Sequence, residues 1–85
     1  MIRSFRDSET ERLCRREPVR KPPPDVRRVA LRKLVLLDAA ETLEDLRVPP
    51  GNRAGQHSVR INDQWRVCFR WKDGDAEDVE MVDYH

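Results

Sequence analysis

The stretch HSVRINDQWRVCFRWKDGDAEDVEMVDY, residues 57–84, decides the fold, because polar and apolar side chains alternate along most of it. Alternation with a period of two is typical of β-strands that bury one face. Two groups of turn-forming residues, NDQ at 62–64 and KDGDA at 72–76, divide the stretch into three runs. Three alternating runs joined by short turns predict an antiparallel meander of three strands.

Two registers are possible between the middle run and the last run, depending on the length of the loop that joins them. A loop with an odd number of residues sets Phe69 opposite Val79 and Val67 opposite Met81, whereas a two-residue loop sets Phe69 opposite Asp78. We expect the odd loop, because it pairs apolar side chains with apolar side chains. Either way, one face of the middle run carries Trp65, Val67, Phe69 and Trp71, and the other carries Arg66, Cys68 and Arg70.

Upstream of the meander, the period changes to that of a helix. Residues 25–41 place apolar side chains at i, i+3, i+4, i+8 and i+11, which is one stripe of a helix; these are Val26, Val29, Ala30, Leu34 and Leu37. A basic group projects away from the stripe, formed by Arg27, Arg28, Arg32 and Lys33. This basic face either contacts water only or binds RNA or an acidic partner.

The residues before and after that helix predict shorter elements. Residues 1–5, MIRSF, are β-prone and predict a first strand. Residues 7–17 begin with capping side chains and carry acidic residues in the first turn, so they predict a short helix, which the proline-rich residues 18–25 end. Thr42 and Asp45 have the spacing of a capping box, which predicts one further helical turn.

The composition bounds the class of protein. The chain has 85 residues, of which 38% are apolar and 39% charged, so we expect a single small domain, residues 1–85, with a thin core. No apolar run reaches the length that a bilayer requires, and the N-terminus is charged too early for a signal peptide. We therefore expect a cytoplasmic protein without a membrane partner. Cys14 and Cys68 lack the spacing of a zinc site, so we expect two reduced thiols and no metal.

The last residues carry the candidate chemistry, since Asp83, Tyr84 and His85 directly follow a strand-like run. Cleavage of RNA needs only a base, an acid and cations, because the 2′-OH of the substrate is the nucleophile. Histidine transfers protons near neutral pH, arginine such as Arg66 binds phosphate, and tyrosine stacks on bases. This set is compatible with RNA cleavage. The alternative is a frayed end beside structural arginines.

The segments MIRSF, TLEDLRVPPGNR, GQHSVRINDQWRVCFRW and VDYH resemble the HigB group of RelE-type toxins. The resemblance runs the whole length and is most specific from Thr42 to His85. It implies an α+β fold, a RelE-like small antiparallel sheet with two N-terminal helices packed on one face. It also implies ribosome-dependent cleavage of mRNA in the A site, without a cofactor or metal, and neutralisation by a cognate HigA-type helix-turn-helix antitoxin.

The resemblance also implies roles for individual residues. The catalytic group would be His85, Asp83, Tyr84 and Arg66, with Arg66 holding the scissile phosphate and His85 as the best candidate for acid or base. The RNA-binding group would be Arg53, Arg47, Arg70 and His57. We interpret His57 first as a strand residue and only second as an RNA contact.

One departure from the family lies after PPGNR. There the family continues into a strand that carries leucines and ends in Lys-Gly-Asp-Arg, whereas here Arg53 leads directly to Ala54, Gly55 and Gln56. About one strand's length is missing, and with it a basic residue next to the RNA site. Arg53 or Arg47 would substitute in part. Three hypotheses remain: an active mRNA endonuclease, a catalytically impaired toxin remnant that binds an antitoxin or a ribosome, and a general RNA-binding domain that needs no ribosome.

Overall fold

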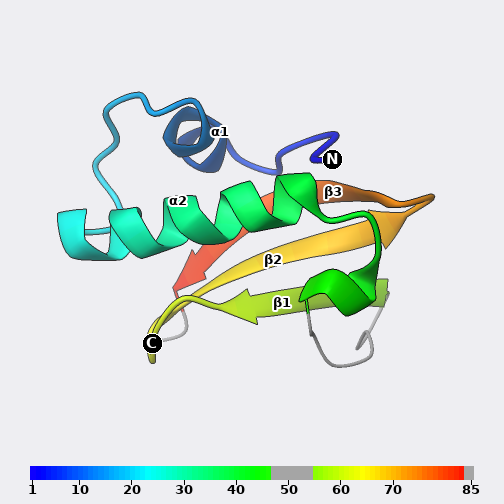
Figure 1. Ribbon diagram of the computed structural model, residues 1–85. Coiled ribbons are helices and arrows are strands. Elements are labelled where there is room, and N and C mark those ends of the chain that lie inside the picture. Colours follow the sequence, from blue (N-terminus) through cyan, green and yellow to red (C-terminus); the bar gives the residue numbers. More distant parts are fainter. Residues whose placement is uncertain (47–54, 84–85) are drawn as a thin grey trace.

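The predicted meander forms a three-stranded antiparallel sheet in the order β1-β2-β3 (Figure 1). The computed structural model describes residues 1–46 and 55–83. Within them the elements are α1 (Ser8–Cys14), α2 (Pro24–Ala39), the short 3-10 helix η1 (Leu43–Leu46), β1 (Gln56–Arg60), β2 (Trp65–Lys72) and β3 (Asp75–Asp83). The α+β class is confirmed. No helix among these elements is long and apolar enough to cross a bilayer.

The β2–β3 turn corrects the expected register. Asp73 and Gly74 form a two-residue loop, and both have positive φ, 52° and 82°. Positive φ at both positions is what a type I′ hairpin turn requires, and Asp-Gly is a preferred pair for it. The expectation of an odd-numbered loop is therefore wrong. The Asp73-Gly74 pair is a strong local turn signal, and in the structure it outweighs the apolar pairing on which that expectation was based.

A β-bulge restores the predicted pairing farther along the same hairpin. Cys68 pairs with Glu80 but Arg70 pairs with Glu77, so Phe69 alone faces both Asp78 and Val79. Asp78 takes the extra position with φ 52°. Beyond the bulge Val67 lies opposite Met81, as predicted.

The N-terminal segment covers the outer edge of β3 without becoming a continuous strand. Ile2 and Phe5 make isolated parallel bridges to Ala76 and Val79, in place of the strand predicted for residues 1–5. The bulge lies between these bridges, where the Asp78 amide donates to the Ser4 hydroxyl at 2.9 Å. Farther along this edge the Met81 amide donates to Thr10 Oγ1 of α1 at 3.0 Å, so segment and helix together cover an edge that would otherwise pair with another chain.

The helices begin as their sequences predict. Asp7 caps α1, because its carboxylate accepts a hydrogen bond from the Thr10 amide at 3.2 Å. At η1 the predicted capping box is present, since the Thr42 amide donates to Asp45 and the Asp45 amide donates to Thr42 Oγ1. In α2 the buried stripe consists of Val26, Ala30, Leu34 and Leu37, and Val29 is half-buried beside it.

Both helices pack on one face of the sheet (Figure 1). Leu13 of α1 and Leu34 of α2 join Val67, Phe69 and Val79 in one buried cluster. Cys14 is half-buried and Cys68 is buried, as expected for two thiols that fill space. Burial also raises the pKa of the Cys14 thiol, which keeps it protonated and weakly nucleophilic at neutral pH.

The N-terminal segment gives a prediction on acid stability. Arg3 Nε lies 2.7 Å from Asp75 Oδ2, and this hydrogen bond holds the pKa of Asp75 below its ordinary value of 3.8. A carboxyl whose pKa is lower in the folded state stabilises the fold above its unfolded pKa, and the contribution is lost as the pH falls through the folded value. We therefore expect Asp75→Asn to lower the free energy of unfolding at pH 7 and to reduce its further fall below about pH 4.

Urea unfolding of both proteins at pH 7 and pH 3 measures this difference. Asp73→Asn is the matched control within the same hairpin, because Asp73 is exposed and forms no salt bridge with another described residue. The prediction would be contradicted if the free energy of unfolding fell by the same amount between pH 7 and pH 3 in wild type and in Asp75→Asn.

Candidate nucleic-acid interface

The face of the sheet turned away from the helices carries arginines from two strands. Because side chains alternate along a strand, Arg66 and Arg70 project opposite to the buried Val67 and Phe69. On β1 the register sets Arg60 directly across from Arg66. These arginines, with Ser58, Gln56 and Cys68 between them, form what we call the open face.

Among these arginines, Arg66 is the most buried. It is half-buried, and its Nη1 donates to the Ser58 hydroxyl at 3.1 Å. Arg70 is freer, because its ion pair with Asp78 is 4.0 Å long and both side chains are about half exposed. An exposed pair of that length contributes little to stability, so the Arg70 guanidinium can exchange Asp78 for another anion at small cost.

Asp83 does not share the open face with Arg66. The register pairs Asp83 with the buried Trp65, which places it on the helix side, whereas Arg66 pairs with Val82. Gln64 Nε2 also donates to Asp83 Oδ2 at 3.2 Å. Of the four predicted catalytic residues, these two are described, and the strand alternation separates them. Tyr84, His85, Arg47 and Arg53 lie outside the described residues.

His57 also lies on the helix side of the sheet. It is a residue of β1, as expected, and its ring stacks on Phe69 with centroids 5.7 Å apart and planes at 26°. Its Nδ1 is buried and has no hydrogen-bond partner among the described residues. The structure therefore does not bring His57 together with the arginines of the open face.

Arg60 is the cation that the sequence interpretation missed. It ends β1 and is exposed, and it faces Arg66 across the hairpin. The signal was present, because HSVRI and QWRVCFRW alternate in phase around a short turn, and counting outward from that turn pairs the two arginines.

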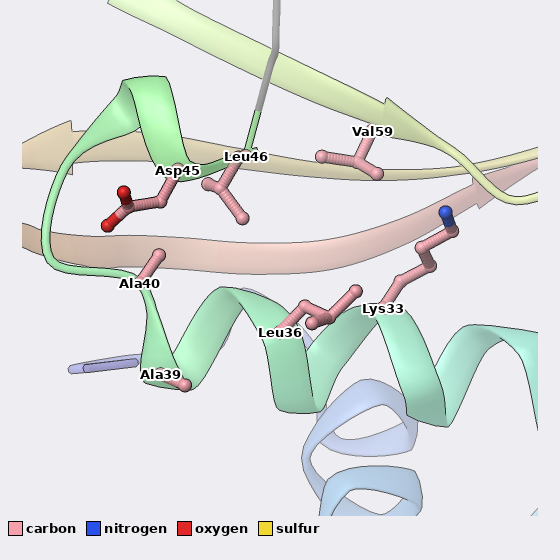
Figure 2. A pocket seen from close by; sticks show the side chains of 7 residues that line it. All are labelled: Lys33, Leu36, Ala39, Ala40, Asp45, Leu46 and Val59. Atoms are coloured by element: carbon pink, nitrogen blue, oxygen red, sulfur yellow. The ribbon is translucent and has the colours of Figure 1, made fainter.

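One pocket lies on the helix side of the sheet, away from the open face. It has a volume of about 290 Å³ and lies between α2, η1 and β1. Figure 2 shows the side chains that line it, which are Lys33, Leu36, Ala39, Ala40, Asp45, Leu46 and Val59. The Asp45 carboxylate accepts hydrogen bonds from the backbone amides of Glu41 and Thr42, which lower its pKa. A carboxylate so engaged is a helix cap and not a free acid or base. In the two described ranges, no three His, Cys, Asp or Glu side chains are grouped to hold a metal.

Comparison with known proteins adds the family to this geometry. Residues 3–85 match the model of the HigB-like toxin family, described as the RelE-like toxin of type II toxin-antitoxin system HigB. The chain belongs to this family. The two helices and antiparallel sheet of this HigB-like toxin agree with the fold that the sequence resemblance implied.

Two curated proteins are similar to this HigB-like toxin. Toxin HigB-1 of Vibrio cholerae is 44% identical over 62 residues, which cover 64% of this chain and 65% of that protein. An uncharacterized protein of Haemophilus influenzae is 28% identical over 69 residues, which cover 72% of this chain and 68% of that protein. The match to HigB-1 thus spans slightly less than two thirds of its length.

Proposed function

We propose that this HigB-like toxin cleaves mRNA in the A site of translating ribosomes, without a metal or other cofactor. One observation supports this most: Arg66 is held on the open face by Ser58 and pairs with Val82, two residues before Tyr84. A guanidinium of the kind that binds phosphate thus lies beside the strand that leads to Tyr84 and His85 in the sequence.

Each group has a distinct part in the proposed reaction. The 2′-oxygen attacks the adjacent phosphorus, and the bond from phosphorus to the 5′-oxygen breaks. His85, with Asp83, handles the proton that leaves the 2′-OH and the proton that the 5′-oxygen gains. Arg66 stabilises the charge on the phosphorane, and Tyr84 stacks on a base. Arg47, Arg53 and Arg70 contact the RNA backbone.

The proposed partners follow from the family. A HigA-type helix-turn-helix antitoxin neutralises the toxin, and the ribosome presents the mRNA, which makes the cytoplasm the place of action. The competing hypothesis is a remnant that binds an antitoxin or a ribosome without cutting. The observation in its favour is the short connection between Arg53 and Gln56, where the family has a further strand.

The test maps cuts in an mRNA on programmed ribosomes and in the same mRNA free in solution. We expect A-site cuts by the wild-type protein on ribosomes only, and about 10²-fold slower cutting by Arg66→Ala, which removes charge stabilisation from the transition state. Arg20→Ala is the matched control, because it removes an exposed arginine from the connection between α1 and α2. Absence of cuts by folded wild-type protein that still binds its antitoxin would support the remnant. Binding to free RNA that weakens steeply with added salt, without cuts, would support the general RNA-binding alternative.

A further inference from the structure

Two like charges face each other at the hairpin end of the open face. Arg60 and Arg66 are directly opposite in the β1–β2 register, where Cβ atoms are about 4.5–5.5 Å apart. Opposed like charges cost stability in a sheet, and an anion placed between two guanidiniums is attracted by both. The two arginines are therefore arranged to bind one anion between them.

The two guanidiniums differ in how firmly they are held. Arg66 is half-buried and bonded to Ser58 Oγ, so its position is set by the sheet. The Arg60 side chain is 61% exposed and stands next to the loop that joins β1 to β2. A held cation beside an exposed one suits a ligand that arrives from solution, because the exposed side chain can turn toward the ligand.

Arg60 has an internal partner that a ligand can replace. Asp63 pairs with Arg60 across the loop, but the Asp63 side chain is 94% exposed. A pair so open to water is weak and easily exchanged. The loop itself does not need this carboxylate, because Asn62 Oδ1 accepts the amides of Gln64 and Trp65, at 2.8 and 2.7 Å.

We propose that Arg60 and Arg66 together bind one phosphodiester of the RNA, and that Asp63 is the counter-ion which this phosphate displaces. The inference rests on the proposed function and adds a residue and a competitor to its site. Arginine forks match phosphate oxygens two by two, and two forks enclose one phosphate from both strands. Arg60 thereby adds a second guanidinium to the phosphate that Arg66 binds. The Asp63 carboxylate competes with that phosphate for Arg60 and so lowers the affinity for RNA.

The test measures binding of the full chain to ribosomes programmed with an mRNA that carries a 2′-deoxynucleotide at the cutting position, across a range of salt concentrations. We expect Arg60→Ala to weaken binding about tenfold and to lower the slope of log K against log salt by about one. We expect Asp63→Asn to tighten binding several-fold. In the Arg60→Ala background the same Asp63→Asn change should have almost no effect, because its target is gone.

Two controls separate this site from general charge effects. Arg20→Ala removes the same charge from the connection between α1 and α2 and should change binding less than twofold. Arg60→Lys keeps the charge but loses the fork, and should recover only part of the affinity. Unchanged affinity and slope for Arg60→Ala, beside a wild-type protein that binds, would overturn the proposal. So would an effect of Arg60→Ala on antitoxin binding with none on RNA, since an acidic protein segment would then be the ligand.

The outcome for this site is distinct from that for cleavage. A wild-type protein that binds the deoxy-substituted mRNA with the expected Arg60 and Asp63 effects, but never cuts the ribose form, supports the phosphate site and overturns the proposed cleavage. A wild-type protein that cuts, with an Arg60→Ala variant of normal affinity and salt slope, overturns the phosphate site alone.

Discussion

Deletion of His85 is expected to slow cleavage of mRNA on the ribosome by about 10²–10⁴-fold, which is the usual contribution of a general acid or base. Among Arg66, Asp83, Tyr84 and His85, only the imidazole has an ordinary pKa near the pH of translation. The β-strand that precedes it ends at Asp83. Loss of activity in a variant that still folds would therefore reflect lost proton transfer.

The measurement compares initial cutting rates of wild type, the deletion and His85→Gln on the same programmed ribosomes. Urea unfolding of each protein checks that the free energy of unfolding is unchanged. His57→Gln is the control for loss of an imidazole in general, because His57 stacks on Phe69 on the helix side. Undiminished cutting by a folded deletion variant would remove His85 from the mechanism.

The separation of Asp83 from Arg66 makes a second comparison informative. If Asp83 orients His85, Asp83→Asn should shift the pH dependence of cutting. If Asp83 only accepts the Gln64 hydrogen bond at the strand end, the rate and its pH profile should stay as in wild type. The proposed function, in which Asp83 acts with His85, predicts the first result. The second result would remove Asp83 from the mechanism and leave it as a residue of the strand end opposite Trp65.

The three strands could be predicted from the sequence, because polar and apolar residues alternate along residues 57–84 and the turns between the runs contain Asn, Asp and Gly. The exact pairing was not readable. Asp73-Gly74 determined a two-residue turn, which by itself would set Phe69 opposite Asp78. The bulge at Asp78, and not a longer loop, shifts the register so that Val67 lies opposite Met81. A bulge depends on packing against Phe69 and on the Ser4 contact, and both are distant in sequence from the turn. Sequence periodicity therefore predicts strands better than registers.

The candidate site divides in the same way. Arg66 was identified through the resemblance, and its outward orientation follows from alternation alone. Arg60 was missed because cross-strand opposition needs the β1–β2 register, which a single strand does not show. Arg27 illustrates the converse, since its guanidinium donates to the Val19 carbonyl and ties the proline-rich connection to α2, a role that its place in a basic helix face did not indicate.

Phe69→Ala is expected to destabilise the protein by about 3–5 kcal/mol, the usual range for a fully buried phenylalanine. Phe69 has no exposed surface, and its ring contacts His57 and Trp71, with centroids 5.7 and 6.4 Å away. A chain of 85 residues has a total stability of roughly 4–13 kcal/mol, so this single change removes a large part of it and unfolds many of the molecules only at the lower end of that range. Urea unfolding measures the loss. Val35→Ala on α2, where Val35 is 46% exposed, should cost less than about 1 kcal/mol.

The same substitution tests how the core positions the open face. Phe69 occupies the single β2 position that faces the bulge, where the β2–β3 register changes. Phe69→Leu keeps most of the buried apolar volume and should recover much of the stability. If Phe69→Leu is folded but cuts mRNA slowly, the ring itself sets the alignment of β3 with Arg66. If Phe69→Leu cuts normally, apolar volume at the bulge is sufficient, and the alignment is set by the Asp73-Gly74 turn.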